Sequence, residues 1–119
     1  MEAQSSPHIV LYVGDDHEDA VTAHLNVDAE GVLTVGKGEH NDLVAGGEFA
    51  SGDHAYLESH RDDFYLVDCS TNGTFVQTED EHVQYVHRAR VRLWGSGWIS
   101  LGQPLHEARP ILFQEVIAR

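Results

Sequence analysis

The sequence predicts an all-β domain, either a sandwich or a barrel. Apolar and polar residues alternate over short runs, which is the pattern of strands that bury one face. Glycine, asparagine or aspartate separates the runs roughly every ten residues, a spacing typical of sandwiches and barrels. No window combines helical periodicity with capping residues, so helices are not expected.

The individual runs give about eleven strands. The second run alternates strictly, with Val21, Ala23, Leu25 and Val27 on one face. A polar stretch from 36 to 53 contains five glycines and one apolar pair, which predicts long connections around a minimal strand. In order, the expected strands cover residues 9–13, 21–27, 32–35, 43–44, 55–58, 64–67, 74–76, 83–86, 91–94, 98–101 and 111–114.

The 119 residues are the size of one compact domain. Residues 1–7 are small and polar and read as a flexible N-terminal tail, so we expect the domain to occupy residues 8–119. Hydrophobic residues make up 41% of the chain, which is typical of a globular protein. A domain of this size buries enough surface to need no disulfide or metal to fold.

The charge balance argues against nucleic acid and membrane surfaces as partners. Twenty acidic residues against seven Lys and Arg give a formal net charge of −13, which would repel phosphates and anionic lipids. No apolar run approaches the ~20 residues that span a bilayer, and the first residues lack the features of a secretory signal. The single cysteine, Cys69, is expected to pack against the core, and one thiol suits a reducing compartment. These features predict a cytoplasmic protein.

The candidate signatures of catalysis and cofactor binding are incomplete. Ser51, Asp53 and His54 are the residue types of a hydrolase triad, but they are neighbours in sequence and no nucleophile elbow surrounds the serine. The nine histidines are scattered without metal-ligand spacing. Gly36 and Lys37 are not followed by the Ser or Thr of a phosphate-binding P-loop. We therefore expect no enzyme, no metal and no cofactor.

Three polar clusters at strand ends form the most specific pattern in the chain. They are Gly36-Lys37, Ser51-x-x-His54 and the Asn72-Gly73 pair. In this order and spacing they resemble the forkhead-associated (FHA) domain family, and the similarity covers roughly residues 9–117. The resemblance implies a β-sandwich of about eleven strands whose loops at one end bind phosphothreonine peptides, as an interaction module in intracellular signalling.

The resemblance also implies a role for each residue of the clusters. Lys37 takes the position of the family's phosphate-contacting arginine. The hydroxyls of Ser51 and Thr71 and the backbone N–H of Gly52 would donate to the phosphate, and the Asn72 amide would hold the peptide backbone. The remaining three residues would support the site without contacting the ligand; they are Gly36, His54 and Gly73.

Two departures from the family pattern affect the expected ligand. Lys37 cannot make the planar two-pronged contact of arginine, and Gly52 lacks the side-chain donor that often stands there. Residues 36–54 contain one cation and four carboxylates, so we expect a phosphothreonine ligand with basic residues near the phosphate. Phe49, two residues before Ser51, either selects an apolar ligand residue or packs in the core.

A second interpretation keeps the fold and removes the phosphate requirement. The domain would then act in protein interaction or assembly through an exposed sheet face. Aromatic and arginine residues are favoured at interface centres, and the candidates are Trp94, Trp98, Arg88, Arg90 and Arg92. Their alternative role is a packed tryptophan pair beside solvated arginines.

Overall fold

The computed structural model describes residues 7–13, 21–27, 31–104 and 110–117, and these form two packed β-sheets. The described residues contain eleven strands and no helix, so the predicted all-β class and strand number are confirmed. The strands are β1 (His8–Val13), β2 (Val21–Asn26), β3 (Leu33–Gly36), β4 (Leu43–Val44), β5 (Ala55–His60), β6 (Asp63–Asp68), β7 (Thr74–Gln77), β8 (Val83–Val86), β9 (Arg90–Leu93), β10 (Ser96–Leu101) and β11 (Ile111–Val116).

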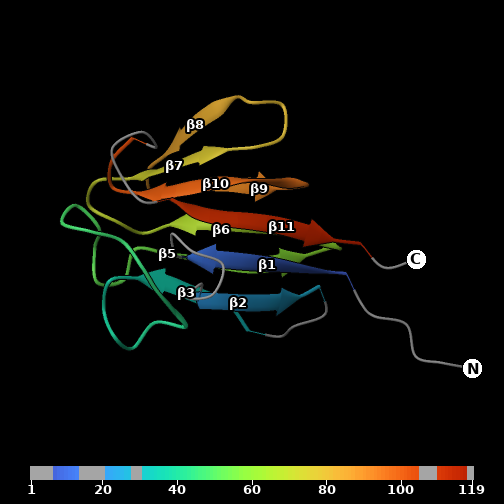
Figure 1. Cartoon of the computed structure of the whole chain (residues 1–119), viewed down its shortest axis with the longest axis horizontal. Coiled ribbons are helices and arrows are strands. Elements are labelled where there is room, and N and C mark those ends of the chain that lie inside the picture. The colour runs from blue at the N-terminus through green and yellow to red at the C-terminus, as the bar shows by residue number, and fades with distance from the viewer. Residues whose placement is uncertain (1–6, 14–20, 28–30, 105–109, 118–119) are drawn as a thin grey trace, which may run out of the picture.

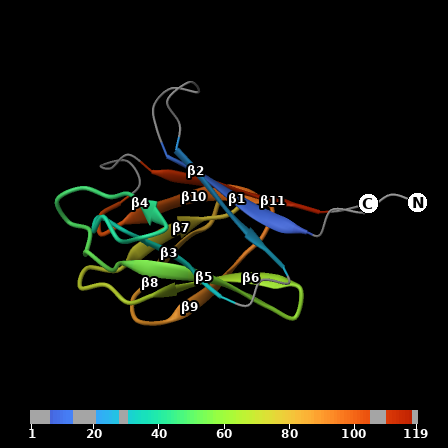
Figure 2. The ribbon, with the colours of Figure 1, turned by 90° about the horizontal axis from the view of Figure 1, so that it is seen from below.

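The two sheets face each other as a sandwich (Figures 1 and 2). One has six strands in the order β2-β1-β11-β10-β7-β8, and the other has five in the order β4-β3-β5-β6-β9. Neighbouring strands are antiparallel except β3 and β4, which pair in parallel. Of the two folds that the alternating pattern predicted, a sandwich or a barrel, the structure is therefore a sandwich.

The core lies between the inner faces of the sheets, as the two-residue periodicity requires. Along β6 every second side chain is buried, and β5 and β11 begin with the same alternation. In β2, Leu25 is buried and Ala23 packs partly against the core. The largest fully buried apolar side chains come from both sheets and include Phe64, Phe113, Ile9, Leu11, Leu57, Leu66, Leu93, Ile99 and Ile111.

Several local predictions differ from the structure. β3 begins at Leu33 and includes Gly36, because Gly36 continues the pairing with β4. β9 ends at Leu93, so Trp94 follows the strand. Cys69 is exposed, not packed, since β6 ends at Asp68 and the cysteine begins the next connection. Of the tail expected at residues 1–7, residues 1–6 lie outside the described residues, and the carbonyl of Pro7 accepts the N–H of Val27 at 2.8 Å.

The connections that follow β3, β4 and β6 gather at one end of the sandwich (Figure 1). The first residue of β1 and the last of β11, His8 and Val116, pair with each other at the opposite end. Within the described part of the chain, no helix has the length and apolarity needed to cross a membrane.

Candidate functional site

Backbone hydrogen bonds join the β3–β4 loop (37–42) to the β4–β5 loop (45–54). The N–H of Lys37 donates to the carbonyl of Ser51 at 3.1 Å, and the N–H of Gly38 donates to the carbonyl of Gly52 at 3.1 Å. The Asn41 amide reinforces this join, because its nitrogen donates to both Gly52 and Gly38 at 2.6 and 2.8 Å. Lys37 is thus fixed beside Ser51, and the Lys37 residue is exposed to solvent.

The β6–β7 loop (69–73) joins the same cluster through Ser51 and Asn72. The Ser51 hydroxyl oxygen accepts the N–H of Thr71 at 3.2 Å, which leaves the hydroxyl proton of Ser51 to donate elsewhere. The side-chain nitrogen of Asn72 donates to the carbonyl of Phe49 at 3.0 Å. These hydrogen bonds therefore bring three loops together. The first contains Lys37, the second contains Ser51 and Gly52, and the third contains Thr71 and Asn72.

Thr71 and Asn72 are exposed, and a tyrosine on β8 holds their loop. The Tyr85 hydroxyl donates to the Asn72 carbonyl at 3.0 Å, and a Cβ added to Gly73 would lie 2.4 Å from the tyrosine ring. Gly73 also has a φ of 88°, which an L side chain rarely adopts. Glycine is thus required at this turn for two independent reasons.

His54 is fully buried and connects two of the loops. The N–H of Ser51 donates to Nδ1 at 3.0 Å, so the ring proton lies on Nε2, which donates to the Gly73 carbonyl at 2.9 Å. Burial lowers the pKa of His54, although the Gly73 carbonyl and the nearby Asp68 carboxylate oppose this shift. The neutral ring is the form that makes both hydrogen bonds.

Asp68, at the end of β6, holds the β6–β7 loop in place through hydrogen bonds to its carboxylate. Its buried carboxylate accepts the hydroxyls of Ser70 and Thr74 at 2.7 and 2.6 Å and the backbone N–H of Arg88 at 2.8 Å. Burial alone would raise the pKa of Asp68, but these hydrogen bonds outweigh it and the pKa is lowered. The Ser70 hydroxyl in turn accepts the N–H of Gly73 at 2.7 Å.

Gly36 and Gly52 serve different purposes. A Cβ on Gly36 would lie 2.3 Å from the Gly52 carbonyl, so only glycine lets the end of β3 approach the β4–β5 loop so closely. A Cβ on Gly52 would meet nothing within 4 Å. Gly52 therefore leaves open space at the surface of the loop cluster.

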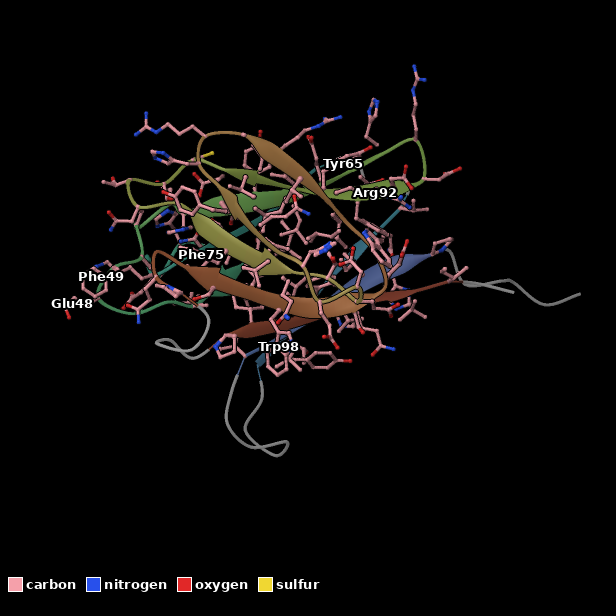
Figure 3. All side chains as sticks on the ribbon, turned by 90° about the horizontal axis from the view of Figure 1, so that it is seen from above. Glu48, Phe49, Tyr65, Phe75, Arg92 and Trp98 are labelled. Carbon is pink, nitrogen blue, oxygen red and sulfur yellow. The ribbon has the colours of Figure 1, made fainter. Side chains whose placement is uncertain are left out.

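The four acidic residues between positions 36 and 54 fall into two groups: two have partners within the protein, and two are exposed. Asp42 turns back to Thr34 and accepts its N–H at 2.9 Å, and Asp53 pairs with the His40 ring. Glu39 and Glu48 are exposed. Figure 3 shows Glu48 and Phe49 projecting from the loop end of the molecule, where the Phe49 residue is 49% exposed. Internal partners thus engage half of the carboxylates that could repel an anion.

Arg88 places a second cation beside the β6–β7 loop. Its Nε donates to the Ser70 carbonyl at 3.4 Å, next to Thr71 in the chain. Arg88 was a candidate for a sheet face, but it lies in the β8–β9 connection with a φ of 55°, between the two strands expected at 83–86 and 91–94.

The hydrogen bonds of His54 are incompatible with a hydrolase triad. Both ring nitrogens bind backbone groups, so neither is directed at the Ser51 hydroxyl. Burial, together with the Asp68 charge, raises the pKa of the exposed Cys69 thiol despite the opposing charge of Arg88, which disfavours the reactive thiolate. Among the residues that the structure describes, no three His, Cys, Asp or Glu side chains group as metal ligands.

The tryptophans and arginines considered as one exposed surface do not lie together. Arg90 and Arg92 are on β9 of the five-stranded sheet, where they pair with Glu58 and Asp63 at 3.1 Å. Trp98 is on β10 of the six-stranded sheet and projects from the other side of the sandwich (Figure 3). The idea of a joint tryptophan–arginine surface is therefore wrong.

Tyr85 and Asn41 support the site, although the sequence pattern predicted no role for either. Tyr85 lies on a short strand whose first three residues are all exposed, and Asn41 lies in a loop between two glycine-rich segments. Their roles depend on contacts across 13 and 11 residues of sequence, which no local pattern encodes.

The fold and the cluster of joined loops define a β-sandwich that presents polar side chains from loops at one end. The family model of the FHA domain matches residues 33–94, just over half of the chain. The chain belongs to the FHA domain family. No curated protein sequence matches it.

Solved FHA domains have the same fold. FHA-1 of Mycobacterium tuberculosis Rv1747 is 16% identical, with a TM-score of 0.69 over 93% of this chain and 98% of that one. A domain from a study of phosphothreonine-dependent FHA interactions is 21% identical, with a TM-score of 0.61 over 94% and 95% of the two chains. Mycobacterium tuberculosis EmbR in complex with a low-affinity phosphopeptide is 21% identical, with a TM-score of 0.59 over 92% of this chain and 24% of EmbR.

Proposed function

We propose that this protein is a non-enzymatic, cytoplasmic interaction module that binds phosphothreonine proteins in signalling. The observation that carries the proposal is the direct hydrogen bonding of three loops, which gathers Lys37, Ser51, Thr71 and Asn72 at one end of the sandwich. The solved relatives support it, because EmbR is described with a phosphopeptide and another FHA domain with phosphothreonine-dependent interactions.

The chemistry of the loop residues suits a phosphate ester. A phosphothreonine has roughly −1.5 to −2 charge and three acceptor oxygens. In the proposed complex the Lys37 ammonium neutralises charge, and the hydroxyls of Ser51 and Thr71 donate to the oxygens. The open surface at Gly52 lets its backbone N–H approach the phosphate without a side chain in between.

Peptide contacts would extend from the phosphate across two neighbouring loops. Asn72 uses one amide N–H to hold Phe49, which leaves its second N–H and its oxygen for the peptide backbone. The half-exposed Phe49 side chain provides an apolar surface for a ligand residue near the phosphothreonine. Asn72 and Phe49 are held by one hydrogen bond, so both contacts would be preorganised.

The remaining acidic side chains would select the flanking residues of the ligand. Glu39 and Glu48 are exposed on the two loops that hold Lys37 and Ser51. A peptide with Lys or Arg near the phosphothreonine would be attracted, whereas acidic flanks would be repelled. We therefore expect basic flanking residues in the physiological ligand.

The test compares one basic-flanked peptide in its phosphorylated and unphosphorylated forms by calorimetry. We expect the phosphorylated form to bind the wild type at least ~10-fold more tightly, since hydrogen bonds to charged groups contribute about 1.5–3 kcal/mol each. Lys37→Ala should abolish this preference, and Lys37→Arg should strengthen it through a two-pronged contact. Asp62→Asn, in the exposed β5–β6 turn, is the control and should bind like the wild type.

Equal affinity for the two peptide forms would assign the chain to the second interpretation, a phosphate-independent interaction or assembly domain. The replacement of arginine by Lys37 and the missing side chain at Gly52 are the features that favour this alternative. In that case the Lys37 substitutions should leave peptide affinity unchanged.

A further inference from the structure

The outer face of the six-stranded sheet is an apolar surface without a described function. Its central feature is a row of residues in register across all six strands: Thr22, Tyr12, Leu112, Trp98, Gln77 and Val83. Trp98 and Leu112 are direct neighbours in the row and are 40% and 37% exposed, and Val83 at its end is 53% exposed. Large apolar side chains that gather on one exposed face are typical of an interaction surface.

A groove of about 430 Å³ lies along the middle of this row, where Tyr12, Leu112, Trp98 and Gln77 line it. Its apolar lining comes from Tyr12, Trp98 and Leu112, and its polar rim includes Glu79 and Glu81 of the β7–β8 turn. Trp98 projects from this face, on the side of the sandwich opposite Tyr65 and Arg92 (Figure 3). The groove is therefore remote from the ion-paired arginines of β9.

Charge is segregated between the two sheets. No described residue of the six-stranded sheet is Lys or Arg, and the described cations are Lys37, Arg61, Arg88, Arg90 and Arg92. Among the described residues, no Lys or Arg pairs with the groove carboxylate Glu79, which accepts the Ser96 hydroxyl at 3.3 Å. The electrostatic potential at the apolar residues of the groove is therefore negative.

These features select one class of occupant. A second copy that met this face with its own six-stranded sheet would offer no described Lys or Arg of that sheet to pair with Glu79 and Glu81. The arginines of β9 on a second copy are engaged with Glu58 and Asp63. A partner segment with apolar residues on one side and cations on the other complements both the apolar lining and the polar rim.

We propose that the Trp98 groove is a second docking site, which binds a basic amphipathic segment of a partner protein. The groove crosses the three gaps between β1, β11, β10 and β7, about 14 Å at ~4.8 Å each. A helix of about 16 residues, at ~1.5 Å per residue, would cover the groove and reach both ends of the row. The site lies on a sheet face, whereas the proposed phosphothreonine site lies on the loops. One partner could therefore occupy both.

The test uses a labelled peptide of about 16 residues with leucines at i, i+3, i+4 and i+7 spacing and lysines on the other face. We expect it to bind the wild type, and Trp98→Ser to weaken binding about 10-fold, as for a central aromatic anchor. Val32→Ser, which removes another exposed apolar side chain outside the groove, is the matched control and should have no effect.

Charge is tested separately. Replacing both groove carboxylates, Glu79→Gln with Glu81→Gln, should weaken the peptide roughly 3-fold and flatten its salt dependence. Glu58→Gln with Asp62→Asn removes the same charge outside both proposed sites and should not weaken the peptide. A peptide with serine for leucine, or with glutamate for lysine, should not bind. Dispersed amide NMR spectra establish that each variant is folded.

Three results would overturn the proposal: equal binding by the serine peptide, no specific effect of Trp98→Ser, or self-association that Trp98→Ser abolishes. Self-association that Trp98→Ser abolishes would show that the groove binds a second copy of the chain. The phosphothreonine proposal is tested independently, because Trp98→Ser should leave phosphopeptide affinity unchanged and Lys37→Ala should leave the lysine–leucine peptide unaffected.

Discussion

At the scale of single residues, His54 and Lys37 contribute to the candidate site in two different ways. His54 is buried and uses both nitrogens for backbone groups of its own chain. Lys37 is exposed, and its own backbone N–H fixes it beside Ser51. The first residue supports the loops through its contacts, and the second provides a charge whose position the backbone determines.

Burial of neutral His54 predicts that the protein loses stability in mild acid. Unfolded histidine takes up a proton near pH 6.5, while the lowered pKa of His54 keeps the native ring neutral to lower pH. The unfolded state then binds more protons, so the free energy of unfolding should fall below about pH 6.5, by at most ~1.4 kcal/mol per pH unit. Urea unfolding between pH 7.5 and 5.5 measures this slope.

His54→Gln is the variant for this comparison. It should be less stable at pH 7.5 and should lose the part of the slope that His54 contributes. Val32→Ser, an exposed substitution that removes no titratable group, is the control and should keep the wild-type slope. Parallel slopes for the wild type and His54→Gln would contradict the assignment.

At the scale of elements, the loops that form the site are held by strand-end residues. Asp68 connects the end of β6 to the start of β7 and to the β8–β9 connection, since it accepts from Thr74 and Arg88. Gly36 lets the end of β3 reach the loop before β5. The loops are thus extensions of the sheet hydrogen bonding and not independent segments.

Asp68→Asn should destabilise the protein by roughly 3 kcal/mol, because the new amide leaves buried donors without an anionic acceptor. Thermal or urea unfolding at pH 7 measures the loss. Asp62→Asn, an exposed substitution of the same kind, should change stability by no more than about 0.5 kcal/mol. If the two variants were equally stable, the Asp68 hydrogen bonds would not hold the loops.

The elements were predictable where their signal is local. Alternation in residues 64–67 and 111–114 and the isolated Leu43-Val44 pair identified strands correctly, since a sheet with one buried face imposes that pattern on the sequence. The exposure of Cys69 and the hydrogen bond from Arg88 to Ser70 depend on how the connections fold. Partners far away in the chain determine this, so the periodicity of single strands did not predict either.

The site was predictable only as a set of motifs. Gly36-Lys37, Ser51-x-x-His54 and Asn72-Gly73 identified the loops, but not the hydrogen bonds between them. Tyr85 became visible only once β8 was paired with β7. The separation of Trp98 from Arg90 and Arg92 likewise follows from sheet order, which the alternation of each strand does not specify.

At the scale of the whole molecule, charge is both large and uneven. The net charge is −13, and the described cations lie outside the six-stranded sheet. A long-range field of this kind acts on any charged ligand before contact, and salt reduces it. Both proposed sites would therefore favour partners with basic residues. The loop site would also bind a phosphate, and the groove would also bind apolar side chains.

The whole-molecule field predicts a salt-dependent preference among phosphothreonine peptides. A peptide with arginine flanks should bind more tightly than one with glutamate flanks, and the affinity ratio should shrink as salt rises. The screening length falls from ~10 Å at 0.1 M to ~3 Å at 1 M salt, which removes the distant charges first. Titrations across this range measure the ratio. A ratio that does not change with salt would assign the preference to direct contacts alone.

His8 and Val116 are partners on adjacent strands, at the pole away from the loops that hold Lys37 and Thr71. A fluorophore or affinity handle attached next to His8 or Val116 would consequently lie at the pole away from these loops. The domain could then be immobilised with its loops facing the solution, which suits a surface-based test of the proposed phosphothreonine binding.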